Sequence, residues 1–146
     1  MRRTLAVLAM VFGLVLGTPL VASASSDHFN GFGPRVSYQG VGVSMGTYYS
    51  HVSGDGTWVQ NVQGWPYINT PVGNICNWEI TAEFFDTQNR WLETLHGGVH
   101  LGCWWYGNQA TGHEIPVNRN MPSGMVCTTL KSNGVRLTSN CHTIHP

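Results

Sequence analysis

The chain has 146 residues, and its seven Lys and Arg balance its seven Asp and Glu at a formal net charge of zero. Proteins that bind nucleic acid normally carry a basic stripe that releases phosphate counterions, and no such stripe is visible, which argues against a nucleic-acid partner. The length suits one domain with its own core and leaves little room for two.

The first 24 residues have the parts of a secretory signal peptide. Two arginines precede an apolar run from Leu5 to Leu16, and Ala22-Ser23-Ala24 supplies small residues for cleavage. A membrane anchor is the weaker interpretation, since a span needs ~20 apolar residues. We therefore expect a secreted, extracellular protein with a single domain over residues 25–146 and no membrane contact once the signal is removed. The remaining 122 residues carry five basic and seven acidic side chains.

The cysteines indicate a disulfide framework. All four lie in the exported part: Cys76, Cys103, Cys127 and Cys141. An even count in an oxidising compartment favours two disulfides. A zinc site built from Cys127, Cys141, His142 and His145 is the alternative. Because Cys141 and His142 are neighbours in a predicted strand, their side chains point to opposite faces, and we predict no metal.

The N-terminal half of the exported part is punctuated by glycine and proline. Residues 25–34, rich in Ser, Gly and Asn, are predicted to form a loose arm. Residues 64–74 contain Pro66 and Pro71, which predicts a loop. Between these segments we predict three short strands with alternating apolar residues: 36–44, 47–52 and 57–62.

The stretch from Cys76 to Tyr106 has the clearest pattern. Alternate residues from Cys76 to Phe84 are apolar and those between them are polar, which predicts a half-buried β-strand. A turn and two further strands are predicted after it, with Gly97-Gly98 as the break between the strands: turn 86–90, strand 90–96 and strand 99–106.

The last predicted element is a hairpin with strands over residues 124–131 and 135–144. A two-residue Asn133-Gly134 turn would place Cys127 and Cys141 on opposite faces, whereas a three-residue loop would make them diagonal neighbours on one face. The second geometry favours a Cys127–Cys141 disulfide, which leaves Cys76 to pair with Cys103. In the preceding polar stretch, only Glu114 to Val117 is expected to pair, as an edge strand.

Many short strands separated by Gly, Pro and Asn predict an all-β sandwich or small barrel. We favour a small antiparallel β-sandwich, immunoglobulin-like in architecture, with two disulfides. The layout of a signal peptide, a Trp-bearing central strand, Gly102-Cys103 and a terminal hairpin ending Cys141-His142-Thr143-Ile144-His145 resembles small two-disulfide secreted β-proteins of actinobacteria. The resemblance covers about the last half of the chain and implies no activity.

Two interpretations of the central stretch exclude each other. In a three-stranded meander with Phe84 opposite Leu92, Cys103 lies level with Phe84, roughly 26 Å from Cys76 at ~3.3 Å per residue. A disulfide needs Cα atoms about 4.4–6.8 Å apart. We therefore expect the chain after Gly98 to cross to the facing sheet, so that Cys76 and Cys103 meet between the sheets.

Two groups of polar residues are candidate catalytic sites. In the meander register Glu83 and Glu93 fall opposite each other, where like charges repel unless a cation, a shared proton or a register shift intervenes. His113, Glu114 and Arg119 could act as acid, base and phosphate clamp in a small secreted hydrolase that cleaves a glycan or a nucleic acid. A shifted register and a solvated loop are the simpler interpretations. The sequence thus favours a non-catalytic protein, and it contains no cofactor motif.

The aromatic residues suggest a binding function. Trp78 and Trp105 fall on apolar faces and are predicted to lie in the core. Aromatic residues at the alternate strand positions are expected to point outward, away from the core: Phe85, Trp91, Trp104 and Tyr106. Aromatic side chains on a rigid sheet can stack on sugars or contact a protein partner, unless the N-terminal strands or the Trp65-Tyr67 loop cover them. The sequence predicts an extracellular binding module that contacts a glycan or a protein partner through these four residues.

Overall fold

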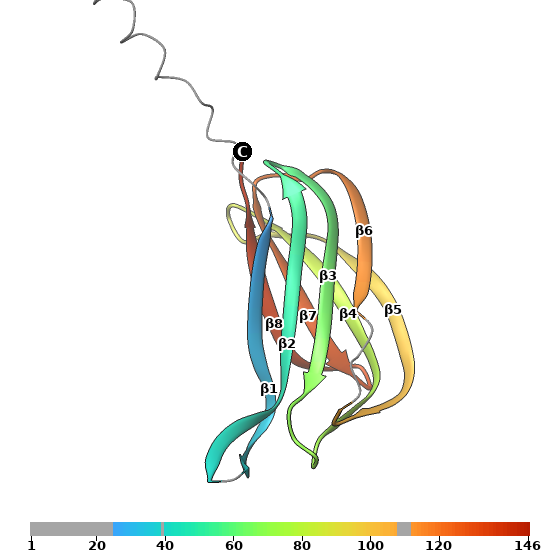
Figure 1. Ribbon diagram of the computed structural model, residues 1–146. Helices are drawn as coiled ribbons and strands as arrows, with labels where there is room; N and C mark the ends of the chain where they lie inside the picture. Colours follow the sequence, from blue (N-terminus) through green and yellow to red (C-terminus); the bar gives the residue numbers. More distant parts are fainter. Residues whose placement is uncertain (1–24, 39, 108–111) are drawn as a thin grey trace, which may run out of the picture.

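The protein is an all-β sandwich in the computed structural model, which describes residues 25–38, 40–107 and 112–146 (Figure 1). Two antiparallel four-stranded sheets pack face to face, as the sequence predicted. The predicted signal peptide lies outside the described residues. Within the described ranges, no helix is long and apolar enough to cross a membrane.

The two sheets share the strands equally. Sheet A has the order β1-β2-β3-β6, with β1 (Ser26–Tyr38), β2 (Val41–Asp55), β3 (Trp58–Ile68) and β6 (His113–Asn120). Sheet B has the order β5-β4-β7-β8, with β5 (Trp91–Trp105), β4 (Asn74–Asp86), β7 (Gly124–Ser132) and β8 (Val135–Ile144). Sheet A lies in front in the view of Figure 1. β6 contains the predicted edge strand Glu114 to Val117 and is indeed an edge of sheet A.

The core lies between the inner faces of the two sheets. Trp78, Ile80 and Phe84 of β4 are fully buried, which confirms the alternation seen in the sequence. They pack with apolar residues of the facing sheet, among them Tyr48 and Val62. Burying a side chain of this size contributes roughly 1.5–3 kcal/mol.

Side-chain bonds close both open sides of the sandwich. On one side β1 lies against β8, where Asn30 Nδ2 donates a hydrogen bond to the carbonyl oxygen of Ser139 at 2.8 Å. On the other side β5 lies against β6, where Arg119 forms an ion pair with Glu93. These contacts join strands that belong to different sheets.

The N-terminal predictions were partly wrong. Residues 25–34 are not a loose arm, because β1 begins at Ser26 and pairs with β2 along most of its length. The predicted strand 36–44 spans the end of β1 and the start of β2. The predicted loop 64–74 is strand as far as Ile68. Pairing of β3 with β6 ends at Gly64, so Pro66 sits where β3 has an open edge and the missing N–H of proline is tolerated.

The central stretch forms one hairpin, so both predicted arrangements of it were wrong. Gly97-Gly98 is not a turn, and β5 does not cross to the facing sheet. The β4–β5 register shifts at three places, and each shift adds one residue to β5. Positive φ angles at Gly98 and Gly102 are of the kind that such bulges use. The shifts bring Cys76 directly opposite Cys103, and the predicted disulfide between them lies within sheet B.

The terminal hairpin contains the second predicted disulfide, Cys127–Cys141. Its turn has two residues, since Ser132 pairs with Val135, and both Asn133 and Gly134 have positive φ, as a type I′ turn requires. A bulge next to Lys131 then shifts the register by one residue and makes the two cysteines direct partners. The predicted three-residue loop was therefore wrong. The zinc alternative is also wrong, because both of its cysteines are in the disulfide.

Candidate ligand-binding face

The outer face of sheet A presents an ordered set of side chains because strand residues alternate between two faces. On β2, Tyr48 and Val52 point into the core, so Thr47, Tyr49 and His51 point outward. The same alternation on β3 directs residues 63, 65 and 67 outward. The register of the sheet then aligns these side chains in rows across the strands.

One row is aromatic and consists of Phe29, Tyr49 and Trp65, which we call the aromatic row. Phe29 is the cross-strand partner of Tyr49, and Tyr49 is the partner of Trp65. The rings of Phe29 and Tyr49 have centroids 5.8 Å apart. Phe29 is 70% exposed and Tyr49 is 44% exposed, so the row offers flat apolar surface to the solvent.

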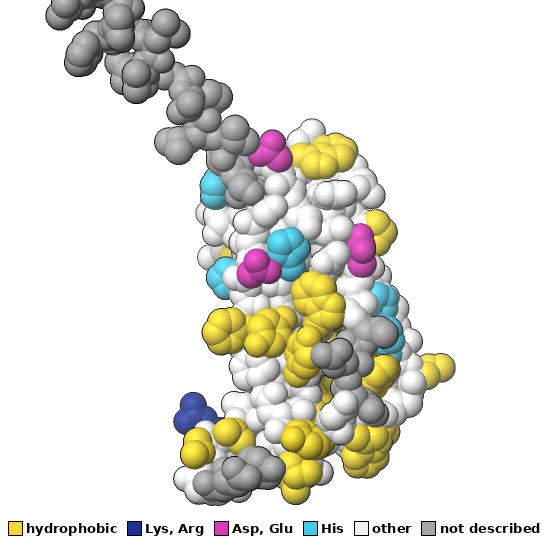
Figure 2. Space-filling view, viewed as in Figure 1, with side chains coloured by type: hydrophobic (Ala, Val, Ile, Leu, Met, Phe, Trp, Pro, Cys, Tyr) yellow, Lys and Arg dark blue, Asp and Glu magenta, His cyan; other side chains and the backbone are white. Residues whose placement is uncertain are grey.

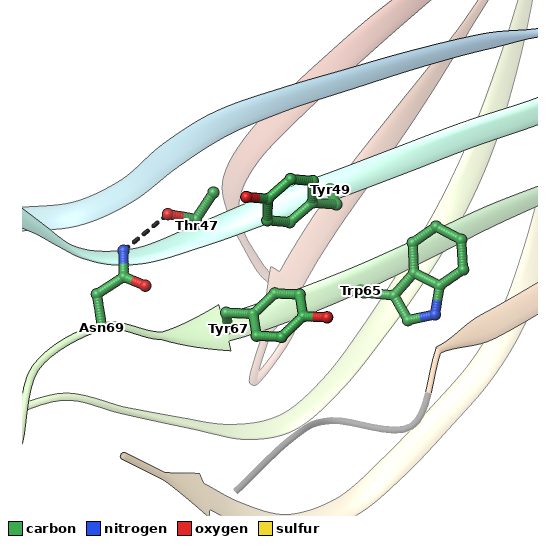
Figure 3. A pocket seen from close by; sticks show the side chains of 5 residues that line it. All are labelled: Thr47, Tyr49, Trp65, Tyr67 and Asn69. Carbon is green, nitrogen blue, oxygen red and sulfur yellow. Dashed lines mark hydrogen bonds between the residues drawn. The ribbon is translucent and has the colours of Figure 1, made fainter. Parts of the chain in front are cut away.

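A shallow pocket opens beside this row (Figure 3). It has a volume of about 360 Å³, and we call it the aromatic pocket; it is lined by Thr47, Tyr49, Trp65, Tyr67 and Asn69. The rings of Tyr49 and Tyr67 meet edge to face with centroids 5.4 Å apart. Asn69 Nδ2 donates a hydrogen bond to Thr47 Oγ1 at 2.7 Å, which holds the polar end of the pocket in place (Figure 3).

Trp65 is held from the side of β6 by a glycine. A Cβ atom at Gly112 would overlap the Nε1 and Cδ1 atoms of the Trp65 indole. The backbone at Gly112 therefore lies directly against the indole, which leaves the ring little room to swing away. An aromatic side chain that is fixed before a ligand arrives loses less conformational entropy on binding.

A polar row runs beside the aromatic row, one outward position further along the strands. It consists of Asp27, His51, Gln63 and Glu114, one from each strand of sheet A. His51 Nδ1 and Asp27 Oδ1 lie 2.8 Å apart. Gln63 Nε2 donates to Glu114 Oε2 at 3.4 Å, and the buried Asn61 donates through Nδ2 to Glu114 Oε1 at 2.7 Å.

The two rows are visible on the surface of the molecule. Figure 2 shows hydrophobic side chains gathered across the middle of this face, with acidic side chains and histidines above them in the view. Among the described side chains in this view, Lys and Arg appear only at the lower left edge of the face. Neither the aromatic pocket nor the polar row includes a lysine or an arginine. The face thus combines aromatic stacking surface with hydrogen-bonding groups and carboxylates.

The aromatic residues predicted from the sequence lie elsewhere, along sheet B. Phe85 and Trp91 are direct cross-strand partners, as parity predicted, and Trp91 is 63% exposed. Tyr106 is also exposed, at the opposite end of β5. Trp105 lies fourteen positions after Trp91 on the same strand, up to roughly 46 Å away at ~3.3 Å per residue. These residues therefore do not form one continuous binding surface.

The predicted orientations of the two tryptophans at the end of β5 were wrong. Trp104, predicted to point outward, is partly buried against the core and meets Trp78 edge to face at 6.3 Å. Trp105, predicted to lie in the core, is 54% exposed. The observed register explains the exchange, because Trp104 is the cross-strand partner of the buried Ile75, whereas Trp105 is the partner of the exposed Asn74.

The predicted carboxylate pair does not form. A register shift between Phe84 and Phe85 places Glu83 opposite Thr94 and Glu93 opposite Phe84. Glu93 instead makes the ion pair with Arg119 across the side of the sandwich. The like-charge contact is thus avoided by a shift of register, the simpler of the outcomes considered from the sequence.

The side chains of the predicted group His113, Glu114 and Arg119 point in different directions. Successive strand residues point to opposite faces, and His113 lies inward, with Nδ1 2.8 Å from His100 Nε2. Glu114 belongs to the polar row on the outer face, while Arg119 binds Glu93. Burial lowers the pKa of His113, and burial together with the charge of His113 lowers the pKa of His100. The arrangement does not bring an acid, a base and a phosphate clamp to one point.

Sequence reasoning missed the face on sheet A. Its signal is the aromatic and polar spacing at every second position, Thr47-x-Tyr49-x-His51 on one strand and Gln63-x-Trp65-x-Tyr67 on the next. The second pattern was hidden because Pro66 made the segment look like a loop. With β3 taken as a strand, both patterns would point to one outward surface.

Comparison with known proteins assigns no function to this surface. No protein-family model matches the chain, and neither a curated protein nor a solved structure is detectably similar to it.

Proposed function

We propose that the protein is a secreted, non-catalytic binding module that holds a glycan on the outer face of sheet A. The observation that carries this proposal is the aromatic pocket, in which Tyr49, Trp65 and Tyr67 from two neighbouring strands stand beside hydrogen-bonding groups. Sugars present apolar C–H faces and a rim of hydroxyls, so they match a surface that offers both stacking and hydrogen bonds.

The size and chemistry of the site favour a glycan over a protein partner or an enzymatic reaction. A pocket of about 360 Å³ falls in the range that small ligands occupy. The carboxylate of Glu114 is engaged by Asn61 and Gln63, which suits a fixed hydrogen-bond acceptor better than a group that exchanges protons.

The disulfides support an extracellular setting for this role. Cys76–Cys103 and Cys127–Cys141 indicate an oxidising compartment. The N-terminal sequence predicts export by a signal peptide. Together they support a module that meets its ligand outside the cell.

A pair of exposed aromatic substitutions tests the proposal. Protein expressed from the full chain is screened on a glycan array, and the affinity for the best ligand is measured for Tyr49→Ala and Trp91→Ala. We expect Tyr49→Ala to weaken binding roughly two- to tenfold, the loss expected for one aromatic stacking contact. Trp91→Ala is the matched control, because it removes an exposed aromatic from sheet B and should leave the affinity unchanged.

Three results would count against the proposal. Loss of binding in Trp91→Ala with normal binding in Tyr49→Ala would move the site to sheet B. If the protein binds no glycan on the array but captures another protein, its ligand is a protein and the glycan proposal is wrong. Glycan cleavage that persists in purified protein would contradict a non-catalytic role. Melting curves of both variants should stay close to that of the original protein, since both side chains are exposed.

A further inference from the structure

We infer that the ligand is an uncharged polysaccharide segment whose pyranose hydroxyls are equatorial, and that it lies across the strands of sheet A. The inference rests on the proposed function and adds the class of ligand and its direction. It is carried by the relation between the aromatic row and the polar row.

The direction follows from the register of sheet A. Phe29, Tyr49 and Trp65 are successive cross-strand partners, so the aromatic row runs perpendicular to the strands. It crosses two strand spacings, or roughly 10 Å. A linear glycan that stacks on more than one of these rings must therefore run across the strands, not along them.

The polar row lies alongside that path. Asp27, His51, Gln63 and Glu114 follow the same cross-strand direction. On β1, β2 and β3 they lie two residues along the strand from the aromatic row. Two residues of strand correspond to ~6.6 Å. A sugar seated on the aromatic row then has its rim, rather than its face, directed at these side chains.

Equatorial hydroxyls suit this geometry. When the hydroxyls of a pyranose are equatorial, both ring faces carry only C–H groups and can lie flat on an aromatic ring. The hydroxyls then project sideways, toward the Gln63 amide and the Glu114 carboxylate. Axial hydroxyls would instead point into Tyr49 or Trp65 and would separate the sugar from the ring.

The charges of the face favour an uncharged chain. Asp27 and Glu114 occupy the two ends of the polar row, on β1 and β6. A carboxylate accepts strong hydrogen bonds from neutral hydroxyls. The same carboxylate repels an anionic sugar, and the pocket and the polar row contain no lysine or arginine. The basic side chain in the polar row, His51, is already bound to Asp27 at 2.8 Å.

The inference is tested with two hexasaccharides that have the same ring skeleton and differ only at C6. Calorimetry compares cellohexaose, which has equatorial hydroxyls, with cellohexaose oxidised at C6, which has the same rings and a carboxylate on each. We expect cellohexaose to bind, and the oxidised form to bind roughly tenfold more weakly at ~50 mM salt. The difference should narrow at ~0.5 M salt because screening weakens the repulsion.

Charge-neutral variants identify the groups responsible. The double variant Asp27→Asn/Glu114→Gln should bring the two hexasaccharides to within about twofold of each other, because the repulsion is removed. Asp55→Asn is the matched control, since Asp55 is an exposed carboxylate at the end of β2, outside the polar row. It should retain the full preference for cellohexaose.

The possible results separate this inference from the proposed function. If the oxidised form binds as tightly as cellohexaose or more tightly, the ligand class is wrong and the glycan function stands. If neither hexasaccharide binds but the array identifies a charged glycan or one with axial ring hydroxyls, the ligand class is again wrong. If no glycan binds at all, the proposed function itself is wrong.

Discussion

His142 on β8 is a titratable side chain buried between the sheets and bonded at both ring nitrogens. Its Nδ1 lies 2.6 Å from Ser26 Oγ, and its Nε2 lies 2.8 Å from Ser50 Oγ. Burial lowers its pKa from 6.5 to about 4, and nearby charges of His28 and His51 act in the same direction. The folded protein therefore keeps this imidazole neutral at pH values where the unfolded chain would protonate it.

This difference makes stability depend on pH. Between pH 6.5 and about 4 the unfolded state binds a proton that the folded state does not, so stability falls as the pH falls through this window. The stabilisation is fully present above pH 6.5, and His142 should account for a loss of roughly 3 kcal/mol by pH 4. Urea unfolding at pH 7.5, 5.5 and 4 measures it.

A substitution isolates the contribution of His142. His142→Gln should flatten the pH dependence in part, because His100 and His113 also have lowered pKa values and remain. His145→Gln, at an exposed position, should leave the dependence as it is. The assignment would be wrong if His142→Gln showed the same slope as the original protein.

A second prediction at the scale of one residue concerns substitution of Gly112. Gly112→Ala should displace the Trp65 indole or push β6 outward, since the new Cβ would overlap the ring. Overpacking of this kind costs roughly 1–3 kcal/mol. The indole N–H resonance of Trp65 should shift in an NMR spectrum, and glycan affinity should fall with it. Gly42→Ala is the control, because a Cβ there meets nothing within 4 Å; equal effects of both variants would contradict the contact.

At the scale of the strand, the local residue pattern predicted an element correctly where it agreed with how that strand pairs with its neighbours. The alternation from Cys76 to Phe84 predicted β4, and its buried face was correct from Trp78 onward. At the start of the strand it was wrong, because Ile75 is buried and Cys76 is only half-buried. The same reasoning placed the break in β5 at Gly97-Gly98, because glycine pairs signal turns and bulges alike. The choice depends on whether β4 continues to pair beyond the glycines. Residues 74–79 supply that pairing, twenty or more positions earlier in the chain.

The candidate site was missed for a related reason. Pro66 argues against a strand in isolation, yet it is tolerated where β3 lacks a neighbour on one edge. The position of that open edge depends on where β6 ends, and a single strand contains no such information. The cysteine pairs were predictable because four cysteines allow only three pairings. The length of the hairpin loop was not, because a two-residue turn followed by a bulge aligns Cys127 with Cys141 as well as a longer loop would.

The two disulfides should stabilise different strands by similar amounts. They join residues 27 and 14 positions apart, for which chain entropy predicts about 3 kcal/mol each. Replacing either pair by serine should lower the melting temperature by roughly 10 °C. Hydrogen exchange should then show faster opening of residues 99–105 without Cys76–Cys103, and of the terminal hairpin without Cys127–Cys141. Identical exchange patterns in the two variants would contradict this local action.

At the scale of the whole molecule, the sandwich is closed by contacts between residues far apart in the chain. The bond between Ser26 and His142 joins positions 116 apart, and Asn140 donates to the carbonyl oxygens of His28 and Tyr48. Sequence periodicity describes one strand at a time, so it could predict two layers but not which edges meet. For that reason the sequence predicts a loose arm over residues 25–34, where β1 in fact begins and its polar side chains help to seal the side of the fold.

The alternation of β2 and β3 has a consequence for how this protein can change. Tyr48 and Val62 fill the core from the same strands whose next residues, Tyr49 and Gln63, face the solvent. Substituting an outward residue leaves its inward neighbours packed as before. Under the proposed function, ligand preference can therefore diversify at every second position without rebuilding the scaffold. This sheet would then serve as a template for selecting new specificities from a small combinatorial library.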